Sequence, residues 1–334
     1  MLLTPANLSL FFSTLETRFW TAYGTTDAWA SKISDMHPTG SEQLANAWIG
    51  MVDKYRLWQG SRITHQPAPQ TYLVQIQNFE LTEQIDLFKL QDDQFGVYTP
   101  TVAFMGLQAK KVYDYQLRDM LQNTGAQTGA IQTCLDGLPY FATNHPVDFY
   151  NASMGTYCNN YEGTFTENGV VVGGALTTNG FNTLWESVSG RKSESGEALG
   201  ITADLTMCPS QLKAVGMTIL QTQMFAPPVM GTLGTGSVGT ANAPFVGAMD
   251  NVLKGWTDLF VNADLNSQPT QWYMFVTKGP LKPLGIAMRE APDFVYRVNP
   301  QDPVVFNTHT VLYGSKARFA PFWTFPWLGN LSSP

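Results

Sequence analysis

The sequence predicts an α+β fold, and three observations lead to that prediction. Two β-type segments at residues 47–52 and 71–76 enclose a connection that contains Gly60, Pro67 and Pro69. One long amphipathic helix begins at Pro100, and the second half of the chain alternates helical and strand-like segments. Because both periodicities are interspersed along the chain, we expect helices and sheets to pack together in a mixed architecture.

The composition favours a chain that associates with other protein surfaces. Its 334 residues can bury a sizeable core, as one large domain or two interleaved ones. Charged residues make up only 13% and aromatic residues also 13%, whereas an ordinary soluble domain has about 25% charged residues. Low charge with many aromatic residues is typical of interface cores, so self-association is favoured. A large aromatic core within a monomer is the alternative.

Charge and cysteine content exclude several classes of protein. The net charge of −7 gives no general electrostatic reason to bind nucleic acid, so any DNA contact is expected to be local. Cys134, Cys158 and Cys208 show no CxxC spacing and follow no secretory leader, which predicts free thiols in a reducing compartment. No apolar run approaches the roughly 18 residues of a membrane span. The sequence therefore predicts a soluble chain that is made in the cytosol.

The first 43 residues predict a helix followed by an arm. Residues 4–23 place apolar side chains at helical spacing, and Thr4 is a suitable cap before Pro5. The apolar positions are Leu8, Phe11, Phe12, Leu15, Phe19 and Tyr23. Residues 24–43 are polar and have little periodicity, so their order is expected to depend on a partner or on the rest of the fold.

The two β-type segments predict a projecting hairpin. Apolar residues alternate at Tyr72, Val74 and Ile76, and the alternation resumes one position out of phase at Phe79, which predicts a bulge at residues 77–78. Between residues 59 and 69 the connection has no apolar alternation beyond Ile63 and has proline at two places. Such a segment fits an exposed hairpin tip better than the interior of a sheet.

The long helix is predicted from Pro100 to about residue 122, with Thr99 as the start signal and Gly125 as the stop signal. A helix of about 23 residues would be roughly 35 Å long. Its apolar face is expected at Val102, Met105, Ala109, Val112, Leu117, Met120 and Leu121, with Tyr113 bridging the wider step after Val112. Further helices are expected at 178–190 and 209–220, strands at 203–208, 257–261, 272–276, 294–298 and 308–318, and a flexible low-complexity loop at 226–247.

A search for catalytic and binding motifs predicts no enzyme. Residues 234–239 match G-x-G-x-x-G, but no strand precedes them and no helix opens within them, so a flexible loop is favoured over a phosphate site. The four histidines have no partner at metal-ligand spacing, and His145 before Pro146 is expected to pack or to hydrogen-bond in a turn. The carboxylates at positions 80, 83, 86, 92 and 93 favour a helix N-terminus or solvent. No Ser occupies G-x-S-x-G, and Cys208 is expected to be buried and inert.

Several short motifs occur in the order and at the approximate distances found in one protein family. They include Trp48-Ile49-Gly50, residues 57–62 (LWQGSR), 95–100 (FGVYTP) and 141–147 (FATNHPV). Further on stand Leu184-Trp185, residues 199–201 leading into 207–209 (MCP), and Trp272-Tyr273. Taken together, the chain resembles the Mu-like major head subunits of tailed phages. Residues 148–175 and 226–247 match nothing that can be anchored in this family.

The resemblance implies the Hong Kong 97-type capsid fold. On that reading residues 1–45 form the N-arm, 46–90 the E-loop hairpin, 91–177 and 286–334 the peripheral domain with a spine helix at 98–122, and 178–285 the axial domain. The E-loop residues expected to contact a neighbouring subunit are Trp58, Arg62, Ile63, His65, Pro67 and Pro69. Gly234, Gly236 and Gly239 would serve flexibility in a loop of the axial domain.

The implied function is that of a major capsid protein with no catalytic role and no cofactor. Identical subunits would form the hexamers and pentamers of an icosahedral shell around double-stranded DNA, without sequence-specific contact. A separate scaffolding protein, a portal and decoration proteins are the other expected partners, with assembly in the host cytoplasm and a final place in the virion capsid. A tail or baseplate component is the alternative, and a nucleotide-dependent enzyme that uses residues 234–239 is a third hypothesis.

Overall fold

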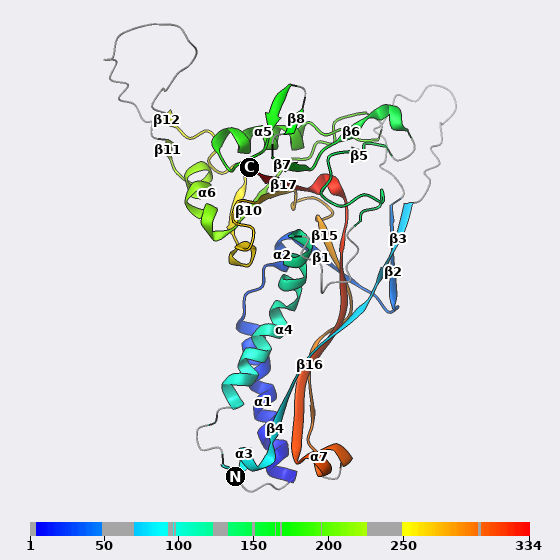
Figure 1. Ribbon diagram of the computed structural model, residues 1–334, viewed down its shortest axis with the longest axis vertical. Coiled ribbons are helices and arrows are strands. Elements are labelled where there is room, and N and C mark those ends of the chain that lie inside the picture. Colours follow the sequence, from blue (N-terminus) through cyan, green and yellow to red (C-terminus); the bar gives the residue numbers. More distant parts are fainter. Residues whose placement is uncertain are drawn as a thin grey trace. The chain divides into compact units, whose positions relative to one another are not determined.

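The computed structural model describes residues 5–48, 70–92, 96, 98–122, 133–148, 151–163, 165–167, 169–194, 196–225, 249–299 and 302–334. The chain divides into two compact units (Figure 1). Unit 1 consists of Met1–Gly50, Ser61–Leu135 and Leu284–Thr324, and unit 2 consists of Met51–Gly60, Asp136–Pro283 and Phe325–Pro334. Each unit is built around its own sheet.

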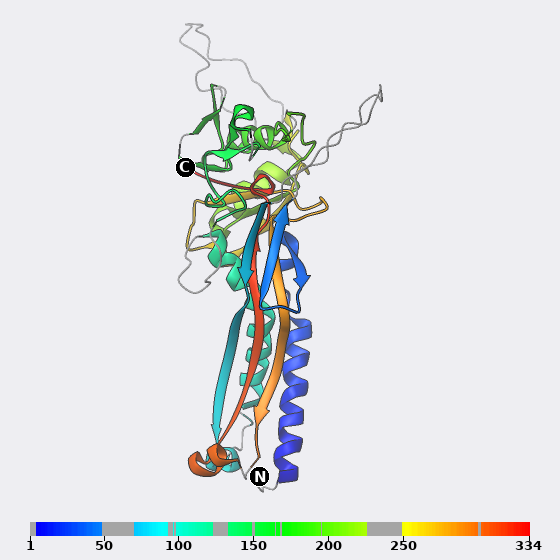
Figure 2. The ribbon, with the colours of Figure 1, turned by 90° about the vertical axis from the view of Figure 1, so that its right-hand side faces the viewer.

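The sheet of unit 1 has the strand order β1-β15-β16-β4. β15 (Leu284–Arg297) and β16 (Thr310–Trp323) are long antiparallel partners, with Leu284 opposite Trp323 and Arg297 opposite Leu312. β1 (Ser34–Pro38) runs parallel to the first residues of β15, and β4 (Gln77–Asp86) runs antiparallel to β16. Figure 2 shows these strands side by side, with β4 along one outer edge.

Two long helices contribute to the core of unit 1. α1 (Pro5–Thr25) buries Leu8, Phe12, Leu15 and Phe19, four of the six positions predicted to form its apolar face. α4 (Tyr98–Leu121) begins and ends within two residues of the predicted long helix. The two helices and the sheet share one apolar cluster, which also contains Val102, Met105, Ala109, Phe294, Val311 and Tyr313.

The shorter helices of this unit are α2 (Ala30–Ile33), α3 (Leu87–Asp92) and α7 (Pro303–Thr308).

The apolar face of α4 differs from the predicted one at one position. Val112 is only half-buried, whereas its neighbour Tyr113 is buried. In a helix with 3.6 residues per turn, Val102, Ala109 and Tyr113 lie on one stripe, and the side chain of Val112 points to one side of that stripe. α1 packs against α4 as well, so both the sheet and α1 contribute to the cluster at this face.

The arm at residues 24–43 is ordered by the rest of the fold. The buried Oδ1 of Asp114 on α4 accepts hydrogen bonds from the backbone N–H groups of Trp29 and Ala30, at 3.0 and 2.8 Å. A carboxylate at this place satisfies donors at the start of α2, which would otherwise have no partner within the helix. β1 then joins the sheet beside β15.

The hairpin strands differ from the predicted ones in their bounds and partners. β2 (Gln43–Trp48) begins four residues before the predicted segment at 47–52, whose last four residues lie outside the described part of the chain. β3 (Gln70–Gln75) pairs with β2, whereas β4 pairs with β16. The predicted bulge at residues 77–78 was wrong, because the phase shift there is a change of partner on either side of Ile76.

The main sheet of unit 2 has the order β13-β10-β14-β17-β7. These strands are β13 (Asp258–Val261), β10 (Leu205–Cys208), β14 (Trp272–Phe275), β17 (Gly329–Ser333) and β7 (Asn160–Glu162). β17 pairs antiparallel with β14 and parallel with β7, and all five of its residues are buried. β17 is therefore held within the sheet by a neighbour on each side.

The helices of unit 2 match the predicted ones. α5 (Thr178–Ser189) is capped by Thr177, whose side chain accepts from the N–H of Gly180, and it buries Phe181, Leu184 and Val188. α6 (Lys213–Leu220) follows a 3-10 turn at Ser210–Leu212.

The remaining described elements of unit 2 are short. The strands are β5 (His145–Pro146), β6 (Thr156–Tyr157), β8 (Phe165–Glu167), β9 (Val170–Val172), β11 (Met224–Phe225) and β12 (Met249–Asp250), and the 3-10 turns are Ala152–Met154, Ala263–Leu265 and Pro326–Leu328.

The two units and the predicted domains divide the chain at different places. Residues 136–177 and 325–334 belong to unit 2, whereas the resemblance grouped them with the peripheral domain. The assignment of N-arm, E-loop, peripheral domain and axial domain stays a prediction.

Candidate assembly surfaces

The residues predicted to contact a neighbouring subunit lie outside the described part of the chain. They are Trp58, Arg62, Ile63, His65, Pro67 and Pro69. The glycines of the predicted axial loop, Gly234, Gly236 and Gly239, also lie outside it. The roles of both sets of residues stay predictions. The structure describes the ribbon base, which consists of the strands on either side of residues 49–69.

That base is a two-stranded ribbon packed on the sheet of unit 1. β2 and β3 pair antiparallel from Gln43 opposite Gln75 to Trp48 opposite Gln70, so the ends of the 49–69 connection lie side by side. Val74 and Ile76 are buried in one cluster with Ala287, Ala320 and Phe322, against which Leu44 and Tyr72 also pack. The Tyr72 hydroxyl donates to the carbonyl oxygen of Trp323. These contacts fix the ribbon to β15 and β16.

Two glycines permit the close packing of unit 1. A Cβ added to Gly285 on β15 would overlap the ring of Phe322, which belongs to the cluster beneath the ribbon. A Cβ added to Gly106 on α4 would overlap the carbonyl oxygen of Phe19 on α1. Neither site could accept a larger residue without movement of its neighbours, so the ribbon base and the helix pair are both tightly specified.

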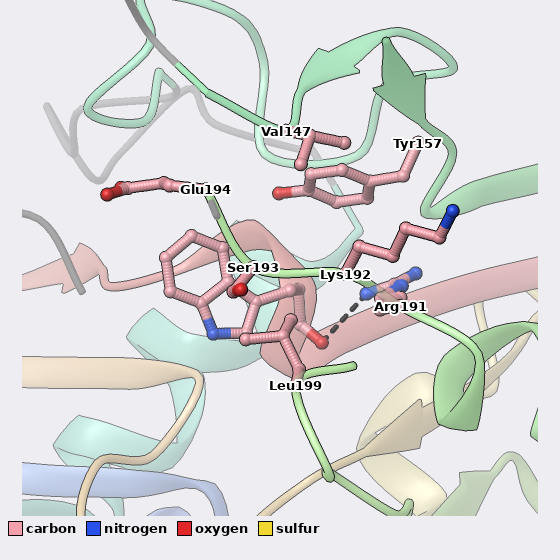
Figure 3. Close-up of a pocket in the computed structure, with 8 residues that line it drawn as sticks. Val147, Tyr157, Arg191, Lys192, Ser193, Glu194 and Leu199 are labelled. Atoms are coloured by element: carbon pink, nitrogen blue, oxygen red, sulfur yellow. Dashed lines mark hydrogen bonds between the residues drawn. The ribbon is translucent and has the colours of Figure 1, made fainter. Parts of the chain in front are cut away.

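A buried cation joins three segments of unit 2. Arg191 follows α5 and is only 5% exposed. Its Nη1 donates to the carbonyl oxygen of Trp327 at 2.7 Å, and its Nη2 donates to the carbonyl oxygen of Cys158 at 2.9 Å and to Oδ1 of Asn330. The guanidinium also lies 5.0 Å from the centre of the Tyr157 ring (Figure 3). The planar guanidinium can bond several oxygens at once, so Arg191 holds these segments together.

A buried asparagine extends this network. Nδ2 of Asn159 donates to the carbonyl oxygens of Tyr140, Pro326 and Gly329 at 2.7, 2.9 and 3.2 Å, and its Oδ1 accepts from the N–H of Ala142. Asn159 is fully buried, and these bonds satisfy both polar groups of its side chain. The network therefore ties residues 140–159 to the segment 326–330.

His145 belongs to the same region. Its Nδ1 lies 2.5 Å from Oδ2 of Asp136, and its Nε2 lies 2.9 Å from the carbonyl oxygen of Tyr140. The ring is fully buried and stacks on Tyr157, with the ring centres 5.5 Å apart. The prediction that His145 packs or hydrogen-bonds is confirmed, but its place in a turn was wrong, because His145 lies in β5 and pairs with Tyr157 of β6.

The pocket beside Arg191 is too small for an organic ligand. Its volume is about 10 Å³, which is enough for about one water molecule. The side chains around it include Val147, Tyr157, Leu199 and Trp327 (Figure 3). Sites for cofactors and substrates typically measure about 300–1,000 Å³. The arrangement in Figure 3 thus serves packing within unit 2.

The carboxylates singled out in the sequence have structural roles or face solvent where they are described, and Asp93 lies outside the described residues. Oδ1 of Asp86 accepts from the N–H groups of Phe88 and Lys89 at the start of α3, as expected of an acidic residue before a helix. Glu80 and Glu83 are exposed. Within the described ranges, no three His, Cys, Asp or Glu residues are grouped to hold a metal ion, and no helix is long and apolar enough to cross a membrane.

All three cysteines are buried and carry free thiols. Burial raises the pKa of the Cys208 thiol from 9.0 to about 11. Burial also raises the pKa of Cys158 to about 11, against the lowering effects of its hydrogen bond to Asn160 and of the nearby Arg191. Because the thiolate is the reactive form, these shifts make both side chains poor nucleophiles.

Alkaline pH should destabilise the subunit through these thiols. The folded state keeps the Cys208 proton up to a pKa of about 11, whereas the unfolded chain loses it near 9.0. The stabilisation is therefore complete below pH 9 and is lost as the pH rises towards 11. We expect Cys208→Ala to show a shallower loss of unfolding free energy than the parent between pH 9 and 10. Urea titrations at each pH give the unfolding free energy. Parallel curves of that free energy against pH for the parent and the variant would contradict the raised pKa of Cys208.

Large apolar side chains also reach the surface of both units. Those more than half exposed among the described residues are Leu10, Leu73, Phe88, Phe104, Val170, Met224 and Val252. Single exposed apolar residues are common in monomers, so they do not by themselves define an interface.

A sequence model of one protein family matches most of the chain. The family is described as Mu-like prophage major head subunit gpT, and the match covers residues 8–172 and 250–330. The matched stretches include α1 from Leu8 onward, all of α4, the ribbon base and all but the last three residues of β17.

The chain belongs to this family.

One individual relative of this Mu-like head subunit matches over part of its length. The major capsid protein of Escherichia phage Mu is 25% identical over 147 residues, which are 44% of this chain and 47% of the relative. The chain therefore spans about half the length of the relative that it matches.

Solved structures establish the fold of this Mu-like head subunit. A chain in the procapsid of bacteriophage JBD30 is similar with a TM-score of 0.53 and 20% identity, over 99% of this chain and 76% of the other. A chain in the bacteriophage JBD30 capsid is similar with a TM-score of 0.55 and 17% identity, over 80% of this chain and 100% of the other. The predicted α+β fold of Hong Kong 97 type is confirmed.

Sequence reasoning missed the residues that hold unit 2 of the head subunit together. Arg191 follows the helix stop at Ser189-Gly190, where a charged residue is expected in solvent, and Asn159 lies in a stretch rich in glycine and asparagine. Neither position has a local signal of burial, because none of the oxygens that bind them is close in the sequence, and those of Pro326 and Trp327 are more than a hundred positions away.

Proposed function

We propose that the chain builds the shell of a tailed-phage head by associating with copies of itself. Identical subunits would form the hexamers and pentamers of an icosahedral shell, and the protein would have no catalytic role. The observation that carries this proposal is the family match over residues 8–172 and 250–330. The low content of charged residues and the high content of aromatic residues support it, since both are typical of interface cores.

Residues 46–90 would act as the E-loop that joins neighbouring subunits. The ribbon of β2 and β3 is fixed to the sheet by Val74, Ile76 and the Tyr72 hydroxyl, which gives residues 49–69 a firm base. The contact residues would be Trp58, Arg62, Ile63, His65, Pro67 and Pro69. The corresponding domains would be the N-arm at 1–45, the peripheral domain at 91–177 and 286–334, and the axial domain at 178–285, where Gly234, Gly236 and Gly239 would provide loop flexibility.

The other partners of the shell would be a separate scaffolding protein, a portal and decoration proteins. Double-stranded DNA would be enclosed without sequence-specific contact, because the net charge of −7 gives the chain no general attraction for phosphate. Assembly would take place in the host cytoplasm, and the mature protein would be a component of the virion capsid.

Replacing residues 61–69 with a short Gly-Ser turn tests the role of the hairpin. The variant should keep the melting temperature of the parent subunit, because the buried residues of the ribbon base are untouched. It should fail to close shells, because contacts between subunits are lost. Electron microscopy of parent and variant prepared side by side measures the difference. Normal particles from a folded variant would rule out the proposed role of this hairpin.

A further inference from the structure

The outer edge of β4 has the features of a strand-addition site. β4 has ten residues and pairs with β16 on one side only. No strand within the described ranges pairs with its other side, where it forms the outer edge of the sheet (Figure 2). Alternate backbone N–H and C=O groups on that side can therefore bond to a further strand.

A partly apolar groove of about 160 Å³ lies beside this edge. Its lining includes Phe79, Leu81, Ala109, Val112, Tyr115 and Ala317. Alternate residues of a strand share one face of a sheet, so Phe79 and Leu81 point to the same side, and Leu81 is 40% exposed. Every second side chain of a strand added beside β4 would point to this side, towards the groove.

The charge of β4 indicates what such a strand would carry. Glu80 and Glu83 are exposed, and the strand contains Asp86 but no Lys or Arg. Lys316 stands opposite Glu80 in the register, yet its Nζ lies 3.7 Å from Glu290, and no ion pair joins Glu80 or Glu83 to a described residue. Opposite charges on neighbouring strands attract, whereas like charges repel.

We propose that this edge binds an extended, basic segment of another protein by strand addition. Main-chain hydrogen bonds to β4 would align the segment, apolar side chains at alternate positions would enter the groove, and lysine or arginine at the positions between them would face Glu80 on the opposite side of the sheet. Pairing of this edge with β4 of a second copy is disfavoured, because that strand carries Glu80, Glu83 and Asp86 but no Lys or Arg. The proposal goes beyond self-association and does not depend on shell formation.

A synthetic peptide tests the chemistry on the full-length, unassembled subunit. The probe is a ten-residue peptide of alternating valine and lysine with blocked ends, and its affinity is measured by titration calorimetry at low salt. Two matched peptides serve as controls. One replaces every lysine with glutamate, and the other carries N-methyl groups along one edge, which remove its main-chain hydrogen bonds but keep its composition. We expect each control peptide to bind at least about tenfold more weakly, a difference of about 1.4 kcal/mol.

Variants of the subunit locate the binding site. Glu80→Lys combined with Glu83→Lys should weaken binding of the lysine peptide about tenfold. Glu186→Lys combined with Glu197→Lys changes the net charge equally at exposed positions of unit 2 and should leave binding unchanged. The proposal fails if the lysine peptide does not bind, if the N-methylated peptide binds equally well, or if both double variants behave alike. If the first double variant instead abolishes association between subunits, the occupant is a second copy.

Discussion

Replacing Met105 with aspartate should lower the free energy of unfolding of the unassembled subunit by about 3–5 kcal/mol, because a buried charge without a partner costs that much. Met105 is 3% exposed and lies in the cluster shared by α1, α4 and the sheet. Its neighbours there include Phe19 and Val102, which offer no hydrogen-bond donor from their side chains. The loss would be a large part of a typical domain's stability.

Lys111→Ala is the matched control on the same helix. Lys111 is only half-buried, and its replacement should cost well under about 1 kcal/mol. Lys110 is a poorer control, because its Nζ lies 4.8 Å from the centre of the Tyr23 ring. Chemical denaturation of unassembled subunits gives both values. Equal midpoints for the two variants would mean that the face through Met105 is not buried, and the placement of α4 would then be wrong.

Arg191→Met should destabilise unit 2 by about 3 kcal/mol. The change removes the donor to the carbonyl oxygens of Trp327 and Cys158 and to Oδ1 of Asn330, and each buried acceptor left without a partner costs about 1–3 kcal/mol. Methionine fills part of the space, so the cavity contribution is small. The backbone amides around Trp327 and Asn330 should be the first to lose protection from hydrogen exchange.

Lys192→Met removes the same charge from the adjacent, exposed residue and should have little effect. Hydrogen exchange measured by mass spectrometry on both variants compares protection in residues 325–333. Unchanged protection in Arg191→Met would contradict the role of the guanidinium in holding this segment.

The long helices could be predicted because their signals are local. Apolar residues at helical spacing, Thr99 before Pro100 and the glycine at position 125 place α4 within two residues of its observed bounds. The same pattern placed Leu8, Phe12, Leu15 and Phe19 on the buried face of α1. The exchange of Val112 for Tyr113 shows that the pattern is less reliable where two apolar residues are adjacent, because only the packed neighbour decides which one is buried.

Features that depend on distant partners could not be predicted. The segments expected at 294–298 and 308–318 overlap two strands of 14 residues each, whose extra length is set by their pairing with each other, and Thr308 instead ends α7. The change of partner at Ile76 was read as a bulge, because both produce the same phase shift. Short strands such as β8 and β9 lack enough residues to show a period. The expected E-loop contacts lie outside the described residues.

Electron microscopy of the purified protein under assembly conditions tests the central claim most directly. If the chain is the subunit of a phage head shell, images should show closed particles of uniform diameter, and averaging should show icosahedral symmetry with hexamers and pentamers. Tubes, stacked rings or only monomers at high protein concentration would contradict the account. Tubes or rings would favour a tail or baseplate component instead.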